Sequence, residues 1–177
     1  MNTRFCVRCR TALALLVAAG LASLAWASFA TPMPRVVYNA SDSVPVGWYR
    51  IGPAHTLHVG SVVLVRLPAA PAALAARRGY LPAHIPLLKR IGAMAPQSVC
   101  VHDGIVHIDG APVAATLRVD GMGRRLAAWP QCRRLARGEL FLLGTDDPAS
   151  FDSRYFGPVP ASAVIGQAQP IRTWPQR

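Results

Sequence analysis

The polar stretch Ser150-Phe-Asp-Ser-Arg-Tyr-Phe-Gly157 follows an apolar run at 140–143 and a turn that opens with Gly144-Thr-Asp. Its serines, aspartate and arginine bring hydroxyl, carboxylate and guanidinium groups close together in the chain. Groups of these types donate and accept the hydrogen bonds that hold a neighbouring side chain in one orientation. We therefore expect a loop at the end of a buried strand whose role is to position another residue.

Upstream of this loop, Pro86-Leu-Leu-Lys-Arg-Ile-Gly92 places a lysine inside an apolar, strand-like segment, and Lys89 is the single lysine beside eighteen arginines. A buried ammonium must be paired or lose its proton, because desolvation lowers the lysine pKa from its usual value of about 10.4. A neutral amine is useful as a general base, so Lys89 is a candidate for that role. In the alternative interpretation, Lys89 extends to solvent while Leu88 and Arg90 alternate around it.

The third polar cluster is Asn39-Ala-Ser-Asp-Ser-Val-Pro-Val-Gly-Trp-Tyr49. Two serines, Ser41 and Ser43, flank Asp42, and Pro45 follows, so the segment is a turn that leads into a strand. By itself this composition is that of an ordinary Asx or Ser/Thr turn.

Two other kinds of site are weaker candidates. Three aspartates in the last cluster offer carboxylates to a metal ion, but they lack the full ligand spacing of a calcium loop (Asp146, Asp147 and Asp152). Histidine is the commoner base beside a catalytic serine. None of the five histidines has sequence neighbours that indicate such a base, and we expect surface or hairpin positions for all of them: His55, His58, His84, His102 and His107.

Short apolar segments bounded by turn residues predict a mostly β fold made of antiparallel strands. Asp103-Gly104 is a strong two-residue hairpin signal. The Ala-rich segment 71–78 predicts a short surface helix or loop. The range 111–138 is rich in Gly, Pro and Arg and predicts a loop-rich, irregular insertion. We expect strands at 35–38, 48–51, 61–67, 87–91, 98–102, 105–108, 139–143 and 163–169.

The N-terminus predicts one transmembrane helix. Three arginines in residues 1–10 precede an uncharged run at 11–30, whose twenty residues span about 30 Å as a helix, the thickness of a hydrocarbon core. The basic flank predicts a cytoplasmic segment at 1–10, a signal-anchor at 11–30 and a periplasmic domain at 31–177. The predicted localisation is the inner membrane, with a single pass. A cleavable signal peptide is the alternative, because Ala25-Trp26-Ala27 and Ser28-Phe29-Ala30 both offer small-residue cleavage sites.

The formal net charge of +11 does not indicate a nucleic-acid partner, because the arginines are scattered singly or in pairs rather than clustered on one element. A solvated surface or attraction to anionic membrane lipid is the better interpretation. On the exported side, where disulfides persist, Cys100 and Cys132 are candidates for a bridge, with two free thiols as the alternative.

Taken together and in this order, the three clusters resemble the sequence boxes of the Ser/Lys type I signal peptidases. The stretch 150–157 is similar to the closing box, in which Gly-Asp-Asn leads to Ser-x-Asp-Ser-Arg and then Gly, although the opening here is Gly144-Thr-Asp. Lys-Arg-Ile-Gly at 89–92 resembles the box with the general base. Ser41-Asp-Ser43-Val-Pro45 resembles the nucleophile box Ser-x-Ser-Met-x-Pro, with its proline one residue sooner. That variant, the insertion and the exported cysteines resemble the conjugative-transfer (TraF-like) pilin-maturation subfamily.

The resemblance covers most of 35–170 and implies an antiparallel signal-peptidase-like β-fold. It also implies a role for each matching residue. Ser43 would attack the scissile carbonyl, and neutral Lys89 would take its proton. The Ser43 backbone N–H, helped by the Ser41 hydroxyl, would bind the oxyanion, while Ser150 would orient the lysine. An ion pair would brace the closing loop, between Asp152 and Arg154.

The expected function is a membrane-anchored serine endopeptidase that cleaves an exported precursor, for which a conjugative pilin is the first candidate, without a metal or other cofactor. The expected partners are that precursor and membrane lipid. One alternative is a general leader peptidase for secreted proteins. Another is a non-catalytic, disulfide-stapled assembly protein of a transfer channel that retains the fold.

Overall fold

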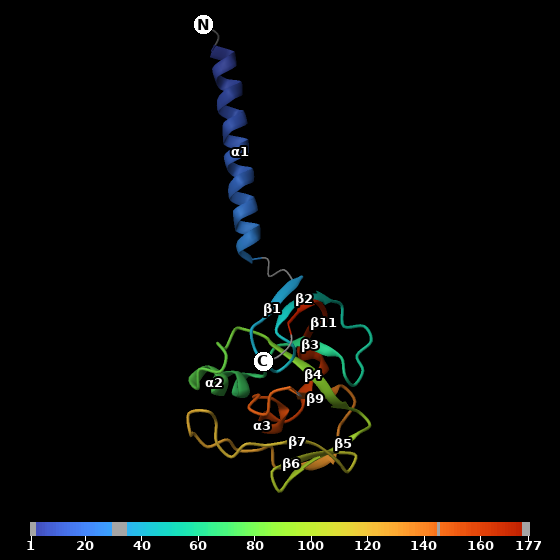
Figure 1. The fold of residues 1–177 in the computed structure, drawn as a ribbon. Coiled ribbons are helices and arrows are strands. Elements are labelled where there is room, and N and C mark those ends of the chain that lie inside the picture. The colour runs from blue at the N-terminus through green and yellow to red at the C-terminus, as the bar shows by residue number, and fades with distance from the viewer. Residues whose placement is uncertain (1–2, 30–34, 145, 175–177) are drawn as a thin grey trace. The chain divides into compact units, whose positions relative to one another are not determined.

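The computed structural model describes residues 3–29, 35–144 and 146–174, and the side chains of the N-terminal helix at position 7 and at 9–28. The chain divides into two compact units, Met1–Met33 and Pro34–Arg177, which are considered separately (Figure 1).

The first unit is one helix, α1 (Thr3–Phe29). Within it, Cys9–Ser28 has a mean hydropathy of 1.8, and none of that stretch is buried. Twenty residues at about 1.5 Å each match the thickness of a bilayer core, so by length and composition this helix is able to cross a membrane. The expected apolar N-terminal helix is therefore confirmed. Its retention after export stays a prediction.

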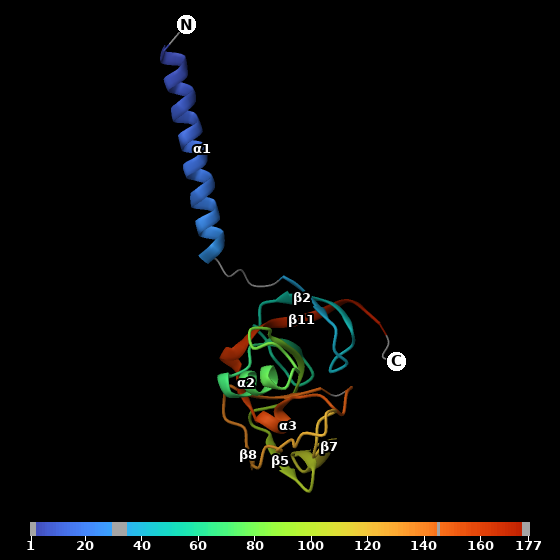
Figure 2. The same ribbon diagram turned by 90° about the vertical axis from the view of Figure 1, so that its left-hand side faces the viewer.

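The second unit is built on two antiparallel sheets and confirms the mostly β prediction (Figures 1 and 2). The larger sheet has the strand order β1-β2-β11-β3-β4-β9-β10, and the smaller one has the order β7-β6-β5-β8. The larger sheet contains β1 (Val36–Asn39), β2 (Gly47–Gly52), β3 (Val62–Val65), β4 (Leu87–Met94), β9 (Glu139–Leu143), β10 (Val159–Pro160) and β11 (Val164–Thr173). The smaller sheet contains β5 (Ser98–His102), β6 (Ile105–Ile108), β7 (Ala111–Ala115) and β8 (Cys132–Arg134). The short helices are α2 (Ala69–Arg77), α3 (Ser153–Phe156) and the 3-10 turn η1 (Ala161–Ala163).

The structure has three strands that the sequence did not predict, β7, β8 and β10, and it extends β4 and β11 beyond their expected ends. Strands β7 and β8 lie at the two ends of the range 111–138, which the sequence presents as irregular. Both are short and mostly exposed, so they lack the apolar alternation that marks a strand. Strand β11 continues beyond 169 because Thr173 still pairs with Gly47 after a bulge in the register. Strand β10 has only two residues, and one of them is a proline, a residue that argues against a strand in sequence-based prediction.

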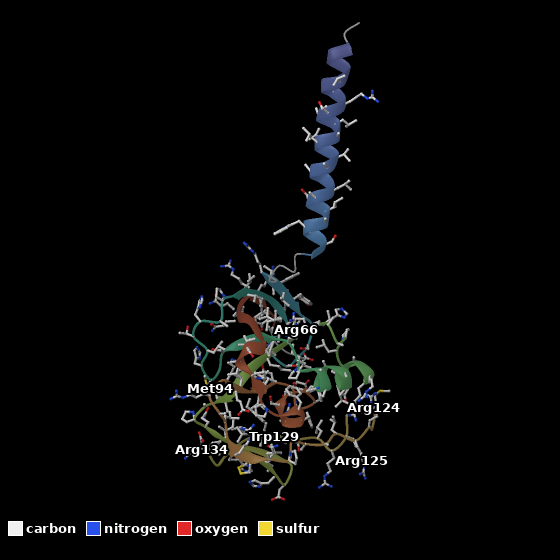
Figure 3. All side chains as sticks on the ribbon, turned by 180° about the vertical axis from the view of Figure 1, so that it is seen from behind. Arg66, Met94, Arg124, Arg125, Trp129 and Arg134 are labelled. Atoms are coloured by element: carbon white, nitrogen blue, oxygen red, sulfur yellow. A yellow bond between two sulfur atoms is a disulfide. The ribbon has the colours of Figure 1, made fainter. Side chains whose placement is uncertain are left out.

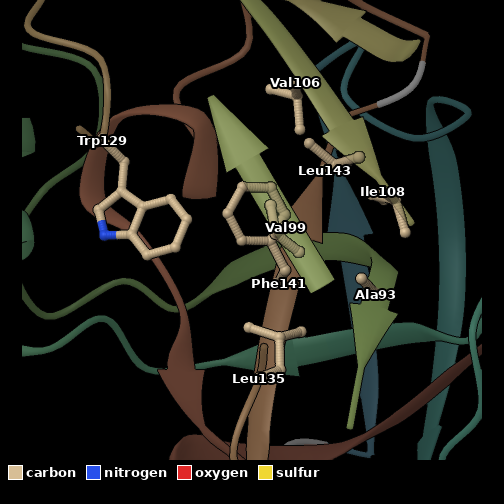
Figure 4. Close-up of a cluster of buried hydrophobic side chains, with 8 residues drawn as sticks. All are labelled: Ala93, Val99, Val106, Ile108, Trp129, Leu135, Phe141 and Leu143. Carbon is tan, nitrogen blue, oxygen red and sulfur yellow. The ribbon is translucent and has the colours of Figure 1, made fainter. Parts of the chain in front are cut away.

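The continuous apolar sequence of β9 is explained by burial on both faces. Leu140 and Leu142 belong to one hydrophobic cluster, and Phe141 and Leu143 point to the other. Successive side chains of a strand alternate between faces, so a strand covered on both sides reads as an unbroken apolar run. The second cluster joins the two sheets, and it includes the indole of Trp129, which lies 5.7 Å from the ring of Phe141 (Figure 4).

The arginines are distributed as expected. Exposed residues such as Arg66, Arg125 and Arg134 lie at separate places around the domain rather than on one element (Figure 3). Arg154 is the exception, because it is only 2% exposed. Its contacts belong to the candidate site.

Cys100 and Cys132 form a disulfide between β5 and β8, where the two residues face each other in the strand register. The bridge closes a loop with a sequence separation of 32. It links β8, near the end of the 111–138 range, covalently to β5 of the smaller sheet. Without it, the three residues of β8 would depend on a single short ladder.

We expect the double variant Cys100→Ser, Cys132→Ser to lose about 3–4 kcal/mol in the free energy of unfolding, because the unfolded chain regains the entropy of an open loop of this length. Urea unfolding of the full chain in detergent measures the difference, and non-reducing peptide mapping checks the bond. Cys9→Ser is the matched control, since that thiol is free and exposed. Free thiols at both Cys100 and Cys132 in the wild-type chain, or equal unfolding midpoints, would contradict the prediction.

Candidate active site

The serine turn between β1 and β2 brings Ser43 into the protein interior. Ser43 is 5% exposed and the neighbouring Val44 is fully buried. The Ser41 hydroxyl lies 3.4 Å from the Ser43 hydroxyl and donates a hydrogen bond of 2.9 Å to Oδ1 of Asn39. The turn therefore holds two serine hydroxyls side by side and buries one of them.

Asn39 holds this turn together, a role that the sequence analysis did not assign. Its Nδ2 donates to the carbonyl oxygens of Ser41 at 2.7 Å and Val44 at 2.9 Å, and its Oδ1 accepts from the Ser41 backbone N–H at 3.2 Å. Asn39 itself is only 6% exposed. From the other side, the hydroxyl of buried Tyr49 donates to the carbonyl of Pro45 at 2.7 Å. The available signal was the Asx chemistry of an asparagine at the start of a turn.

Lys89 lies in the middle of β4, opposite Val63 of β3, and is 2% exposed. Its Nζ lies 2.6 Å from the Ser43 hydroxyl oxygen and also donates a short hydrogen bond to the Ser150 hydroxyl. The structure thus brings together Ser43, Lys89 and Ser150, which the sequence separates widely. The alternative in which the lysine extends to solvent is wrong, because the closing loop covers the amine.

Burial lowers the pKa of Lys89 to about 8, and the charge of Arg154 acts in the same direction, while Asp152 and Asp147 oppose the shift. Removing an ammonium from water disfavours its charged form. With a pKa of about 8, roughly a tenth of the amine is neutral at pH 7. A neutral amine within hydrogen-bond distance of a hydroxyl has the geometry of a general base beside a nucleophile.

The closing loop is fixed by the buried pair Asp152 and Arg154, which are 0% and 2% exposed. The guanidinium donates to both carboxylate oxygens, from Nε at 2.8 Å and from Nη2 at 2.9 Å. The same carboxylate caps α3 by accepting from the Arg154 backbone N–H at 3.1 Å, and it accepts from the Gly144 N–H at 2.7 Å. Two donors on a planar fork fix the geometry more tightly than one contact does.

Two further features attach this loop to the sheet. The Ser153 hydroxyl accepts a hydrogen bond of 2.9 Å from the backbone N–H of Leu142 in β9. Gly157, with a φ of +78°, lies so close to Trp129 that an added Cβ would meet the indole at 2.6 Å. The last glycine of the stretch at 150–157 is therefore required by both its backbone angle and its packing.

Gly144 makes room for the serine that contacts the lysine. A Cβ at this position would lie 2.2 Å from Oγ of Ser150 and 3.1 Å from Cβ of Ser43. The carboxylate of Asp152 binds the Gly144 N–H, so the backbone here has little freedom to move away. The alternative of a metal site at Asp146, Asp147 and Asp152 is weakened, because the Asp152 carboxylate already accepts hydrogen bonds from Arg154 and Gly144.

A cleft of about 670 Å³ opens onto these groups. Ser43, Lys89 and Ser150 line one part of it, and apolar side chains such as Leu81, Leu87 and Phe151 line the adjoining wall. This volume lies in the range of ordinary ligand pockets. All five histidines are among the described residues, and none of them lines the cleft.

The chain is similar to several known proteins. Residues 8–174 match the family model for signal peptidase, peptidase S26. The chain is 37% identical to the probable conjugal transfer protein TraF of Sinorhizobium fredii, over 77% of this chain and 76% of the relative. It is 30% identical to a plasmid transfer protein TraF of Escherichia coli, over 91% of each. A crystal structure of a signal peptidase I from Enterococcus faecalis aligns with 64% of this chain and 97% of its own, with a TM-score of 0.41 and 19% identity.

We expect Gly144→Ala to lower peptidase activity about 100-fold without removing any reactive group, because its Cβ displaces Ser150 from Lys89 and a shift of about 1 Å has effects of this size. The rate of substrate processing measures the loss, and thermal unfolding confirms that the variant folds. Gly52→Ala is the matched control, since nothing lies within 4 Å of its added Cβ. Equal activity of both variants would show that the position of Ser150 is unimportant.

Proposed function

The chain belongs to the peptidase S26 signal peptidase family, and from this we propose that it is a serine endopeptidase that cleaves exported precursor proteins with Ser43 and Lys89. The observation that carries the proposal is the 2.6 Å contact between the buried Lys89 amine and the Ser43 hydroxyl, both of which line a cleft of about 670 Å³.

In the proposed reaction, Ser43 Oγ attacks the scissile carbonyl while its proton passes to Lys89 Nζ. Lys89 then gives that proton to the leaving amine as the peptide bond breaks, which leaves an ester on Ser43. Water attacks the ester carbonyl while Lys89 takes one of its protons, and Lys89 passes that proton to Ser43 Oγ as the ester bond breaks and the product acid departs. Ser150 orients the amine through its hydrogen bond to Nζ. The proton transfers balance with the Ser43 hydroxyl, the Lys89 amine, the peptide substrate and water.

We assign the stabilisation of the negative charge that develops on the carbonyl oxygen to the backbone N–H of Ser43, with the Ser41 hydroxyl as a second hydrogen-bond donor. In the structure this hydroxyl donates to Asn39 instead of into the cleft. To serve the oxyanion, it has to exchange that partner when a substrate is present. Asn39 therefore defines where the Ser41 hydroxyl rests before the substrate binds.

The proposed substrate is a precursor that is itself tethered to the membrane, with a conjugative pilin as the first candidate. The support for this choice is that relatives 30% to 37% identical are named as conjugal or plasmid transfer proteins. Helix α1, with Arg10 near its start, supports an anchor whose N-terminus is cytoplasmic and whose catalytic domain is periplasmic. A substrate with its own membrane segment is then held in the same membrane as the enzyme.

Co-expression with pilin precursors, followed by intact mass measurement, tests the activity. We expect the wild-type chain to shorten a precursor, and Ser43→Ala and Lys89→Ala each to leave it uncut, because both partners act in the same proton transfer. The matched control is Cys9→Ser, which keeps the dyad. A secreted precursor with a leader is run in parallel, and its cleavage in place of the pilin would favour a general leader peptidase. Normal processing by either dyad variant would refute the mechanism.

The pH profile tests the state of the lysine separately. Only the neutral amine is a base, and burial sets the pKa of Lys89 at about 8. The rate should therefore fall about tenfold per pH unit below pH 8 and level off above it. Initial processing rates between pH 6 and 9.5 give the midpoint, and circular dichroism over the same range checks the fold. A rate that stays level down to pH 6 would contradict a neutral lysine base.

A further inference from the structure

Residues 119–125 form a tight hairpin, called here the cleft hairpin. Val119 and Arg125 make an isolated antiparallel bridge, and the backbone N–H of Asp120 donates to the carbonyl of Arg124 at 2.9 Å. Oδ1 of Asp120 accepts from the backbone N–H groups of Met122 at 3.0 Å and Arg124 at 2.9 Å. The hairpin therefore has a defined shape, although it lies in the range that the sequence presents as irregular.

A charged cluster attaches the hairpin to the end of α2. The Asp120 carboxylate accepts a short hydrogen bond from the Tyr80 hydroxyl and pairs with Arg124 Nε at 2.7 Å and with Arg78 Nη1 at 3.5 Å. In return, Arg78 Nη2 donates to the carbonyl of Arg125 at 2.7 Å, and Arg124 Nη2 donates to the carbonyl of Arg78 at 3.0 Å. The Asp120 side chain is only 5% exposed, whereas the side chains of Arg78 and Arg124 are 21% and 38% exposed.

The hairpin and the reactive groups line the same cleft. Asp120, Gly121 and Met122 line it from one side, and Ser43 and Lys89 line it from another. The two sides are also connected, because the ring of Tyr80 lies 5.2 Å from that of Phe151, which directly follows the serine that contacts Lys89. A peptide that reaches Ser43 has continuous access to the hairpin.

We propose that the cleft hairpin is the wall against which the enzyme reads an extended segment of its precursor, and that Met122 contacts an apolar side chain of that segment. This inference rests on the proposed function. Met122 is 79% exposed, the highest value among the exposed large apolar side chains of residues 35–174, and a flexible thioether adapts to different apolar partners. Asp120 is paired with Arg78 and Arg124, which also line the cleft, so the wall presents backbone, the Met122 thioether and a net positive charge to the precursor.

Gly121 provides a direct test of this wall. No atom lies within 4 Å of a Cβ added there, and its φ is one that other residues adopt. Gly121→Phe should therefore fold normally while its ring occupies the cleft. Gly52→Phe is the matched control, because Gly52 has equal free space but lies in β2, outside the cleft lining.

Two measurements are made with the pilin precursor that contains its membrane segment, both in detergent with the full chain. The first is kcat/KM for processing, and the second is the Kd of the precursor for each variant combined with Ser43→Ala, which does not depend on cleavage. We expect Gly121→Phe to lower kcat/KM and weaken binding about tenfold or more, and Met122→Ala to weaken binding less. Gly52→Phe should match the wild type, and the pH midpoint should not move in any variant.

The outcomes separate the two proposals. If the wild-type chain binds the precursor without cleaving it, and Gly121→Phe still weakens that binding, the proposed function is overturned but the hairpin is upheld as the binding wall. Cleavage and binding that are unchanged by Gly121→Phe overturn the hairpin proposal and leave the proposed function standing. A shifted pH midpoint would show that the ring disturbs Lys89 rather than the precursor, which also overturns it. A precursor that neither binds nor is cut overturns both.

Discussion

The active arrangement depends on the burial of one amine. A pKa lowered from 10.5 to about 8 corresponds to about 3 kcal/mol by which the folded protein disfavours the charged lysine. That cost is sustained because three separate elements close around Nζ: strand β4 carries it, the turn after β1 supplies Ser43, and the loop after β9 supplies Ser150. The sheet order places β4 between β3 and β9, so the lysine is surrounded by strands on both sides.

The buried pair of Asp152 and Arg154 keeps that enclosure in place. A buried ion pair is a weak source of net stability, since each ion loses its hydration, but the loss of one partner is costly. Here every strong contact has a positional consequence: the carboxylate holds Gly144, and the guanidinium reaches the carbonyl of Ala115 at 2.8 Å. The opposite charges also act on Lys89 in opposite directions. The pair therefore fixes geometry, while its two charges shift the pKa of Lys89 in opposite directions.

The sequence predicted those parts of the structure that local chemistry determines. The solitary Lys89 in an apolar strand, the Asp103-Gly104 hairpin and the polar stretch at 150–157 each carry their signal within a few residues. Contacts between distant segments were not predictable in this way. The bonds of Asn39 depend on how the turn folds back, and the contact of Asp120 with Tyr80 joins residues 40 apart. Strand β8 has three residues, of which two are arginines, so pairing rather than pattern defines it.

Helix α3 is four residues long, yet it receives both ends of the segment that carries the cleft hairpin. Tyr155 accepts from the Leu117 backbone N–H at 2.9 Å, and the carbonyl of Arg154 accepts from the Trp129 backbone N–H at 2.8 Å. Both attachments lie on the helix that directly follows the loop containing Ser150 and Asp152. A change in the length or composition of the intervening residues would therefore alter the cleft hairpin without touching the contacts among Ser43, Lys89 and Ser150.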